Sequence, residues 1–157
     1  MRELLFKGKA KGTGEWVSGG YLQRAEAKYY FKKDQALIHS YISSDWTTYF
    51  GLPSELTIHE VESSTICQYT GLNDKNGKKI FEGDILRHVD ETILKTVWND
   101  RKYGFAAQCV KGSVLLKDCK WGLWEFESDE VEVIGNVFDN PELLKGEKED
   151  EHSNKMR

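Results

Sequence analysis

The sequence predicts a mainly β protein made of short antiparallel strands, with an SH3-like small barrel or a curled sheet in the C-terminal half and one short C-terminal helix. Two observations carry this prediction. Aromatic residues make up 12% of the 157 residues, and 14 glycines accompany only 2 prolines, a composition typical of strands joined by tight turns. Short aliphatic or aromatic runs also alternate with polar turn sequences along the chain.

The N-terminal region, residues 1–65, is expected to be rich in strands. The runs Leu4–Lys11 and Trp16–Gln23 flank a glycine-containing turn and predict a hairpin. Gly19 and Gly20 inside the second run indicate a bulge or the close approach of another backbone, because glycine has no side chain in the way.

A second hairpin is predicted over residues 28–42, where two short apolar runs flank a polar turn at residues 33–35. The run at residues 24–31 is also compatible with one turn of helix. A breaker sequence at residues 51–54 and a strand at residues 66–69 follow.

Residues 66–144 carry the stronger strand signal and are expected to form one continuous domain with residues 1–65. Five short strands at this spacing favour a curled sheet or a small barrel. The segment Trp121–Trp124 is expected to cross one end of this sheet as a loop or short turn. The five strands, each bounded by polar turn residues, are Ile85–Val89, Ile93–Trp98, Tyr103–Val110, Ser113–Leu116 and Val131–Val137.

Two turns lead into the first of these strands. Asp74–Gly77 is a tight-turn sequence, because asparagine and glycine adopt positive φ at low cost. Glu82–Asp84 forms the second turn, and Gly83 within it is expected to take the backbone geometry that the bend needs.

The C-terminus changes character. Asn140 is expected to cap a helix whose first position is Pro141, and Glu142 favours the positive end of the helix dipole. Residues 145–157 are almost entirely polar and have nothing to bury, so they are predicted to form a disordered tail.

Charge is distributed unevenly along the chain. Residues 1–40 contain eight lysines or arginines and four acids, whereas the remaining residues contain fourteen and twenty-two, so the net charge of −4 combines a +4 end with a −8 body. Overall attraction to nucleic acid is therefore not favoured, although the basic end can contact phosphates. Solvated strand faces account for the imbalance more simply.

Three cysteines, Cys67, Cys109 and Cys119, are widely spaced and odd in number, which predicts free thiols in a reducing cytoplasm. The N-terminus lacks the apolar run and the small-residue cleavage site of a secretory signal. No run approaches the roughly 18 apolar residues that a membrane span requires. These features predict a cytoplasmic protein with no membrane partner.

No catalytic, cofactor or metal site is predicted, and the chain is expected not to be an enzyme. A calcium loop aligned on Gly77 would need acids at the positions of Leu72 and Gly83. Asp84 and His88 on one strand would stand about 13 Å apart, too far to chelate one ion. The glycine patterns of phosphate and dinucleotide loops are absent from the sequence, as is the Gly-x-Ser-x-Gly elbow.

Aromatic and basic residues of the second half form the candidate binding surface. Aromatic side chains supply much of the buried area of a small core, so a core position is the simpler interpretation for each of them. Any that is exposed beside Arg101 or Lys102 becomes a contact for a peptide or a nucleic acid. The candidates are Trp98, Arg101, Lys102, Tyr103, Trp121 and Trp124.

An acidic stripe follows this region. A solvated outward face is its simplest interpretation, and docking onto a basic partner, or mimicry of a phosphate backbone, is the sharper alternative. The stripe consists of Glu125, Glu127, Asp129, Glu130 and Glu132.

Three blocks of sequence, made mainly of turn glycines, strand aliphatics and a helix start, occur in one order along the chain. They are Arg2–Lys9 with Gly14–Val17 and Gly20-Tyr21, then Gln68–Leu72 with Asp74–Lys78 and Ile80–Ile85, and finally Glu132–Phe138 with Asn140–Leu144. In this order the blocks resemble the YopX-like proteins of bacteriophages and prophages. The resemblance implies a small, strand-rich protein encoded by a phage or an integrated prophage in a bacterial host, and it brings no established activity with it.

These observations favour a non-catalytic phage accessory protein that binds an unknown host or phage protein. Exposed strand edges also favour self-association as a homo-oligomer. Two alternatives stay open. An enzyme would require histidine and acidic side chains to converge in one pocket. A small-barrel nucleic-acid binder would contact phosphates through Arg2, Lys7, Lys9, Lys11 and Arg24.

Overall fold

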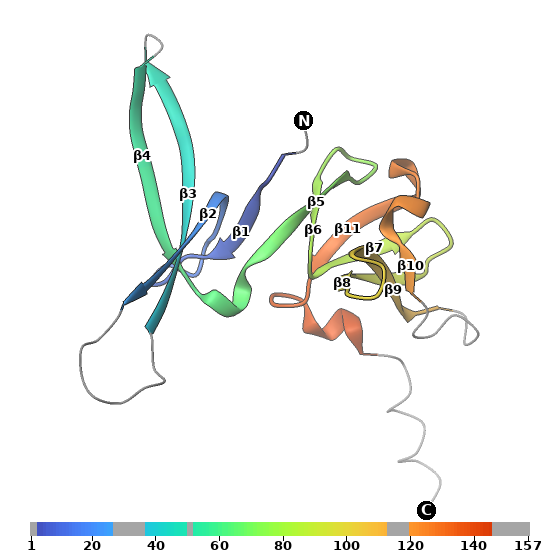
Figure 1. The fold of residues 1–157 in the computed structure, drawn as a ribbon. Coiled ribbons are helices and arrows are strands. Elements are labelled where there is room, and N and C mark those ends of the chain that lie inside the picture. Colours follow the sequence, from blue (N-terminus) through green and yellow to red (C-terminus); the bar gives the residue numbers. More distant parts are fainter. Residues whose placement is uncertain (1–2, 27–36, 50–51, 113–119, 146–157) are drawn as a thin grey trace, which may run out of the picture. The chain divides into compact units, whose positions relative to one another are not determined.

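The computed structural model describes residues 3–26, 37–49, 52–112 and 120–145, and for residues 25–26, 37–38, 44–49 and 52–56 only the backbone is considered. All secondary structure in these ranges is β-strand or a short 3₁₀ turn, so the predicted mainly β fold class is confirmed. The chain divides into two compact units, Met1–Tyr69 (unit 1) and Thr70–Arg157 (unit 2), as Figure 1 shows. No helix in the described ranges is long and apolar enough to cross a membrane.

Unit 1 is an antiparallel sheet with the strand order β4-β3-β2-β1-β5. The predicted first hairpin is confirmed, since Lys9 of β1 pairs with Trp16 of β2. The turn of the second predicted hairpin, at residues 33–35, lies outside the described residues. The elements are β1 (Phe6–Lys9), β2 (Trp16–Glu26), β3 (Leu37–Tyr49), β4 (Leu52–Val61), the 3₁₀ turn η1 (Ser63–Thr65) and the first residues of β5 (Cys67–Asn73).

Strand β2 changes its pairing partner at two glycines. Residues up to Gly19 pair with β1, and Gly20 begins the pairing with β3 opposite Ser43. A Cβ atom on Gly19 would lie 1.7 Å from the carbonyl oxygen of Ser43. Only glycine therefore lets the two backbones come this close, and the predicted close approach of another backbone is confirmed.

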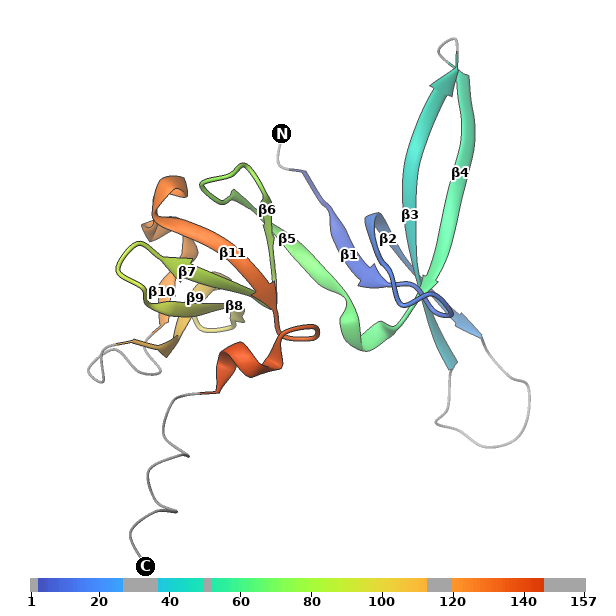
Figure 2. The ribbon, with the colours of Figure 1, turned by 180° about the vertical axis from the view of Figure 1, so that it is seen from behind.

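Unit 2 contains a five-stranded antiparallel sheet with the order β10-β9-β8-β7-β11, while β6 pairs with β5. Figure 2 shows β11 and β7 from behind, where they run side by side. The strands are β6 (Lys79–Phe81), β7 (Asp84–His88), β8 (Ile93–Asn99), β9 (Gly104–Lys111), β10 (Lys120–Gly122) and β11 (Val131–Asn136), with 3₁₀ turns η3 (Leu123–Glu125), η4 (Ser128–Glu130) and η5 (Pro141–Leu144).

Four of the five strands predicted for this half are confirmed as β7, β8, β9 and β11, and the fifth, at residues 113–116, lies outside the described residues. The described strands do not close into the SH3-like barrel, which was one of the two predicted forms. Strands β10 and β11 lie at opposite ends of the strand order. The prediction for Trp121–Trp124 was wrong in part. Trp121 and Gly122 pair with Ala107 and Ala106 as strand β10, and the 3₁₀ turn begins only at Leu123.

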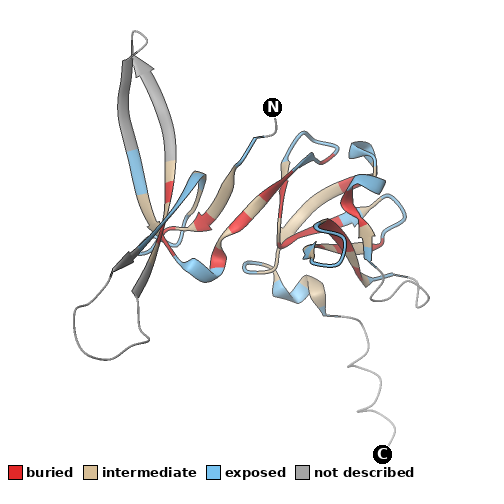
Figure 3. Ribbon diagram, in the orientation of Figure 1, coloured by how far each residue is buried: buried red, intermediate tan, exposed pale blue. Residues whose placement is uncertain are grey.

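The core of unit 2 lies on one face of this sheet. Leu86, Leu94 and Cys109 stand opposite one another across β7, β8 and β9, so their side chains share a face, and all three are buried. Figure 3 shows the buried positions along these strands. The full cluster is Ile80, Leu86, Leu94, Phe105, Ala107, Cys109, Leu123 and Val131, with Trp121, Phe126 and Val133 packed against it.

The two turns predicted before β7 are confirmed, and each has a clear structural basis. Asp74 is buried, and its carboxylate accepts the backbone N–H groups of Asn76 and Lys78 in the turn and of Val133 in β11, at 2.9 to 3.0 Å. Burial alone would raise the pKa of Asp74, but these three donors outweigh it and lower the pKa below its usual value. Gly77 and Gly83 both have a φ of 78°, the left-handed geometry that favours glycine.

The predicted C-terminal helix was wrong in extent, because the structure has only the four-residue 3₁₀ turn η5. Pro141 does occupy its first turn, but the Asn140 side chain makes no capping bond. Its Oδ1 instead accepts the backbone N–H of Asn136 at 3.3 Å. Lys145 is already extended, with φ −76° and ψ 120°. Of the predicted tail, residues 145–157, only Lys145 is described, and residues 146–157 lie outside the described residues.

Candidate functional site

A pocket of about 250 Å³ opens in unit 2, where the turn between β7 and β8 meets β10 and the segment after it. Its lining mixes aromatic and aliphatic side chains with ionisable ones. The lining residues are His88, Asp90, Thr92, Leu94, Trp121, Glu125 and Phe126.

The β7–β8 turn builds the polar side of this pocket. The backbone N–H of His88 donates to the carbonyl oxygen of Thr92, and that of Glu91 donates to the carbonyl oxygen of His88, both at 2.9 Å. The Asp90 carboxylate accepts the N–H of Thr92 at 2.9 Å. Aspartate side chains in turns commonly accept the backbone N–H of the residue two positions later in the chain. The turn therefore holds the Asp90 carboxylate next to the His88 ring.

His88 and Asp90 form a hydrogen-bonded pair. Nδ1 of the His88 ring donates to Oδ1 of Asp90 at 2.8 Å. This bond, followed by the bonds from the Thr92 hydroxyl and N–H, lowers the pKa of Asp90 from 3.8 to about 2. Asp90 is therefore an anion at neutral pH. Nε2 of His88 has no hydrogen-bond partner within the described part of the chain.

Aromatic rings build the other side of the pocket. The Phe126 ring lies edge-on to the rings of His88 and Trp121, with centroids 5.7 and 6.5 Å away. Leu94 is fully buried at the inner wall. Glu125 also lines this side of the pocket, and its Oε1 accepts the backbone N–H of Gly122 at 2.9 Å. Its Oε2 has no hydrogen-bond partner among the described residues.

The residues that line the pocket can bind a ligand through charge, hydrogen bonds and contacts with aromatic rings. Its lining contains neither a thiol nor a serine, and its one hydroxyl, on Thr92, bonds to Asp90. Cys67 and Cys109 are buried outside the lining and form no disulfide among the described residues, while Cys119 lies outside them. Within the ranges described, no group of three or more histidine, cysteine, aspartate or glutamate side chains has a geometry suited to a metal ion.

The structure brings five of the six predicted surface residues to the end of the β8–β9 hairpin and places the sixth, Trp121, in the pocket wall. Trp98 is the last residue but one of β8, and Trp124 lies over Gly104, the first residue of β9. Trp98 is 41% exposed, Tyr103 83% and Trp124 58%. We call the set Trp98, Arg101, Lys102, Tyr103 and Trp124 the hairpin tip.

The tryptophans of the hairpin tip lie on opposite faces of the sheet. Trp98 stands opposite Phe105, and their rings meet edge to face with centroids 5.1 Å apart, so Trp98 shares the core face. Gly104 precedes Phe105 and faces the other way, and the Trp124 ring covers it. The hairpin tip therefore carries an exposed aromatic side chain on each face and a third, Tyr103, in the turn.

Tyr103 has an unusual backbone conformation. Its φ is 50°, in the left-handed region that costs a side chain with a Cβ roughly 1–2 kcal/mol. Glycine or asparagine would meet this geometry at lower cost. Since the tyrosine ring is almost fully exposed, packing within unit 2 does not account for its presence.

Besides Glu125, two residues of the acidic stripe have local roles. The Glu130 carboxylate accepts the backbone N–H of Glu127 at 2.9 Å, a bond that closes turn η4. Glu132 lies 2.8 Å from Nζ of Lys75 and 2.9 Å from Arg87, and these two bonds lower its pKa to about 2.

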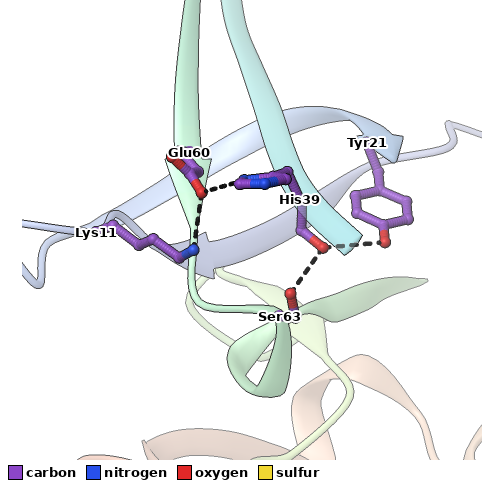
Figure 4. Close-up of polar contacts among 6 residues, drawn as sticks. Lys11, Tyr21, His39, Glu60 and Ser63 are labelled. Carbon is purple, nitrogen blue, oxygen red and sulfur yellow. Dashed lines mark hydrogen bonds and ion pairs between the residues drawn. The ribbon is translucent and has the colours of Figure 1, made fainter. Parts of the chain in front are cut away.

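Unit 1 contains a separate polar cluster, which Figure 4 shows. Glu60 accepts hydrogen bonds from Lys11 at 2.7 Å and from the ring of His39 at 2.8 Å, and these bonds lower its pKa. Ser40 is fully buried, and its hydroxyl lies 2.9 Å from that of Ser63. The Tyr21 hydroxyl lies 3.5 Å from the Ser40 hydroxyl. These bonds link β2, β3, β4 and η1, which is a structural role.

Sequence reasoning missed most of the pocket. A histidine at a strand end, followed two residues later by an aspartate in the turn, was the available signal for the His88–Asp90 pair. Glu125 was noted only as part of the acidic stripe. The missed lining residues are His88, Asp90, Thr92, Leu94, Glu125 and Phe126.

The fold and the pocket define an all-β protein of two units, with a small polar and aromatic pocket in the second. The chain belongs to the YopX protein family, whose model matches residues 22–145. This confirms the resemblance, although the first of the three resembling blocks, residues 2–21, lies entirely before the matched range. No curated protein matches the chain. Among solved structures it is similar to protein EF1440 from Enterococcus faecalis, with 23% identity over 92% of this chain and 100% of that one and a TM-score of 0.46.

Proposed function

We propose that this YopX-family chain is a non-catalytic accessory protein of phage or prophage origin, which acts by binding a host or phage protein through the hairpin tip of unit 2. The observation that carries the proposal is Tyr103, which is 83% exposed and held at a φ of 50°. A strained residue with no packing role favours a functional explanation.

The composition of the hairpin tip supports a protein contact. Tryptophan, tyrosine and arginine are the residues that most often dominate the energy of protein interfaces. The tip presents all three types within one short segment, with Trp98 and Trp124 flanking the turn. The pocket brings His88, Asp90 and Glu125 together, which is the convergence that the enzyme alternative requires, but the protein contact proposed here is made by the hairpin tip and not by the pocket.

Affinity capture from a lysogenic bacterial host tests this function. The bait is the full chain, and the comparison is a triple variant of the hairpin tip, Trp98→Ser, Tyr103→Ser and Trp124→Ser. A matched control, Leu22→Ser with Ile58→Ser, removes exposed apolar side chains from unit 1. We expect the same protein to be enriched by the wild type and the control and lost with the tip variant.

Two results of this capture experiment would contradict the function. One is enrichment of no protein by the wild type, and the other is equal enrichment by all three baits. Light scattering of the purified chain shows in parallel whether a second copy is itself the partner, as the predicted self-association requires.

Nucleic-acid binding is a second candidate, favoured by the basic face of β1. Nζ atoms of Lys7 and Lys9 lie over the Trp16 ring, 5.1 and 5.5 Å from its centroid. Lys11, in contrast, pairs with Glu60. A gel-shift assay at low salt with single- and double-stranded DNA and RNA tests this candidate, since such binding weakens steeply as salt rises. Absence of any shift would remove it.

A further inference from the structure

The pocket of unit 2 has a size that suits one long side chain. Its volume of about 250 Å³ lies below the roughly 300–1,000 Å³ of pockets that hold small molecules. Buried Leu94 and the rings of Trp121 and Phe126 give it apolar walls. Such walls can cover a methylene stem while the polar end of the side chain meets the ionisable residues.

Two carboxylates line the pocket without a lysine or arginine partner. Asp90 bonds to His88 and Thr92, and Glu125 accepts only the N–H of Gly122, so neither forms an ion pair with a lysine or arginine of the described ranges. Glu132 differs, since Lys75 and Arg87 both lie within 2.9 Å of its carboxylate. The two pocket carboxylates are therefore available to a cation from another molecule.

The lining of the pocket is acidic. It contains two carboxylates, those of Asp90 and Glu125, and no lysine or arginine. A surface of this charge attracts cations and repels phosphates, which disfavours a nucleotide or a nucleic acid as the occupant. Aromatic rings next to carboxylates favour a cation that can also contact a ring face.

We propose that this pocket binds an arginine side chain of the partner protein. A guanidinium group is planar, stacks on aromatic rings and can make two parallel hydrogen bonds to one carboxylate, whereas a lysine ammonium is a compact and strongly hydrated charge. Trp121 and Phe126 supply the rings, and Glu125 supplies the carboxylate. The inference rests on the proposed protein-binding function and adds a contact outside the hairpin tip.

Titration of the ¹⁵N-labelled full chain, followed by NMR, tests the inference. The probe is an acetylated and amidated peptide, Gly-Gly-Arg-Gly-Gly, and the matched control peptide carries citrulline, a neutral isostere of arginine. We expect the arginine peptide to shift the amide signals of His88 and Thr92 and the indole signal of Trp121, with a millimolar Kd. A third peptide, with lysine in place of arginine, should bind more weakly, and the citrulline peptide should cause no saturable shift.

Variants of the chain separate a specific contact from general attraction of charge. Glu125→Gln keeps an oxygen that can accept the N–H of Gly122 but loses the charge, and we expect the Kd to rise about tenfold, as for a hydrogen bond to a charged group. Asp129→Asn removes one charge from the same segment outside the pocket lining and should leave the Kd within about twofold.

The inference is overturned if arginine and citrulline peptides cause equal shifts, if no pocket signal moves, or if Asp129→Asn weakens binding as much as Glu125→Gln. Retained signal dispersion shows that each variant is folded. The outcome is separable from that of the host capture, because a partner lost only with the hairpin-tip variant would support the function even if the pocket bound no arginine.

Discussion

The indole ring of Trp124 lies directly against Gly122, two residues earlier in the chain. A Cβ atom on Gly122 would come within 2.3 Å of the ring, and one on Gly104 within 3.0 Å. The two glycines therefore define where the Trp124 ring lies on the outer face of the hairpin tip.

Replacing Gly122 with alanine should displace this ring. The obstacle is a side chain that can rotate, so we expect the free energy of unfolding to change by about 1 kcal/mol or less. The indole NMR signal of Trp124 should move, while that of Trp98 serves as the internal reference. An unchanged Trp124 signal in the alanine variant would contradict the described contact.

Tyr103→Asn should stabilise the chain and weaken its binding at the same time. Asparagine tolerates positive φ, so we expect the free energy of unfolding to rise by about 1 kcal/mol, measured by urea denaturation. Glu91 has a φ of 67° and lies outside the hairpin tip, which makes Glu91→Asn the matched control. It should stabilise the chain by a similar amount and leave capture of the host protein unchanged. Loss of stability in Tyr103→Asn would argue that the ring has a folding role.

Asp74→Ala should be among the most destabilising single changes in unit 2. The substitution leaves the N–H groups of Asn76, Lys78 and Val133 without their acceptor, and we expect a loss of about 3 kcal/mol. Asp100→Ala, at an exposed position of the β8–β9 turn, should change stability by about 0.5 kcal/mol or less. Urea denaturation followed by tryptophan fluorescence measures both. Equal effects of the two substitutions would show that the hydrogen bonds of Asp74 to the turn and to β11 do not stabilise unit 2.

The His88–Asp90 pair should make stability depend on pH in the acid range. The pKa of Asp90 falls from 3.8 to about 2 on folding, so the bond contributes fully above about pH 4 and is lost as pH falls through about 2. The difference in urea midpoint between wild type and Asp90→Asn should therefore be constant near neutral pH and shrink between about pH 4 and pH 2. A difference that stays constant over this range would contradict the pairing.

Much of the strand pattern could be predicted from the sequence, because glycines mark places where only their backbone fits. Gly19 predicted the close approach of another backbone and Gly83 predicted a bend, and the structure has both. Strand β10 could not be predicted, since three residues ending in Gly122 show no alternation and pair only because β9 lies alongside. The predicted helix after Asn140 is only a 3₁₀ turn, and the Asn140 side chain, which was expected to cap it, accepts the N–H of Asn136 instead.

The pocket was harder to predict because its residues meet through strand pairing and local turns. Trp121 reaches the pocket through the pairing of β10 with β9, whose register no short motif reveals. The bond between His39 and Glu60 has the same origin, as the two residues lie 21 positions apart on paired strands. Residue types in the sequence indicated binding potential, but the fold decided which of them converge.

The central claim is that the hairpin tip contacts a partner protein, and site-specific photo-crosslinking in a lysogenic host tests it most directly. p-Benzoylphenylalanine replaces Tyr103 in one version of the chain and Phe138, an aromatic residue of unit 2 outside the tip, in the other. We predict one discrete crosslinked product from position 103 and none from position 138. No product at 103, or the same product from both positions, would contradict the claim.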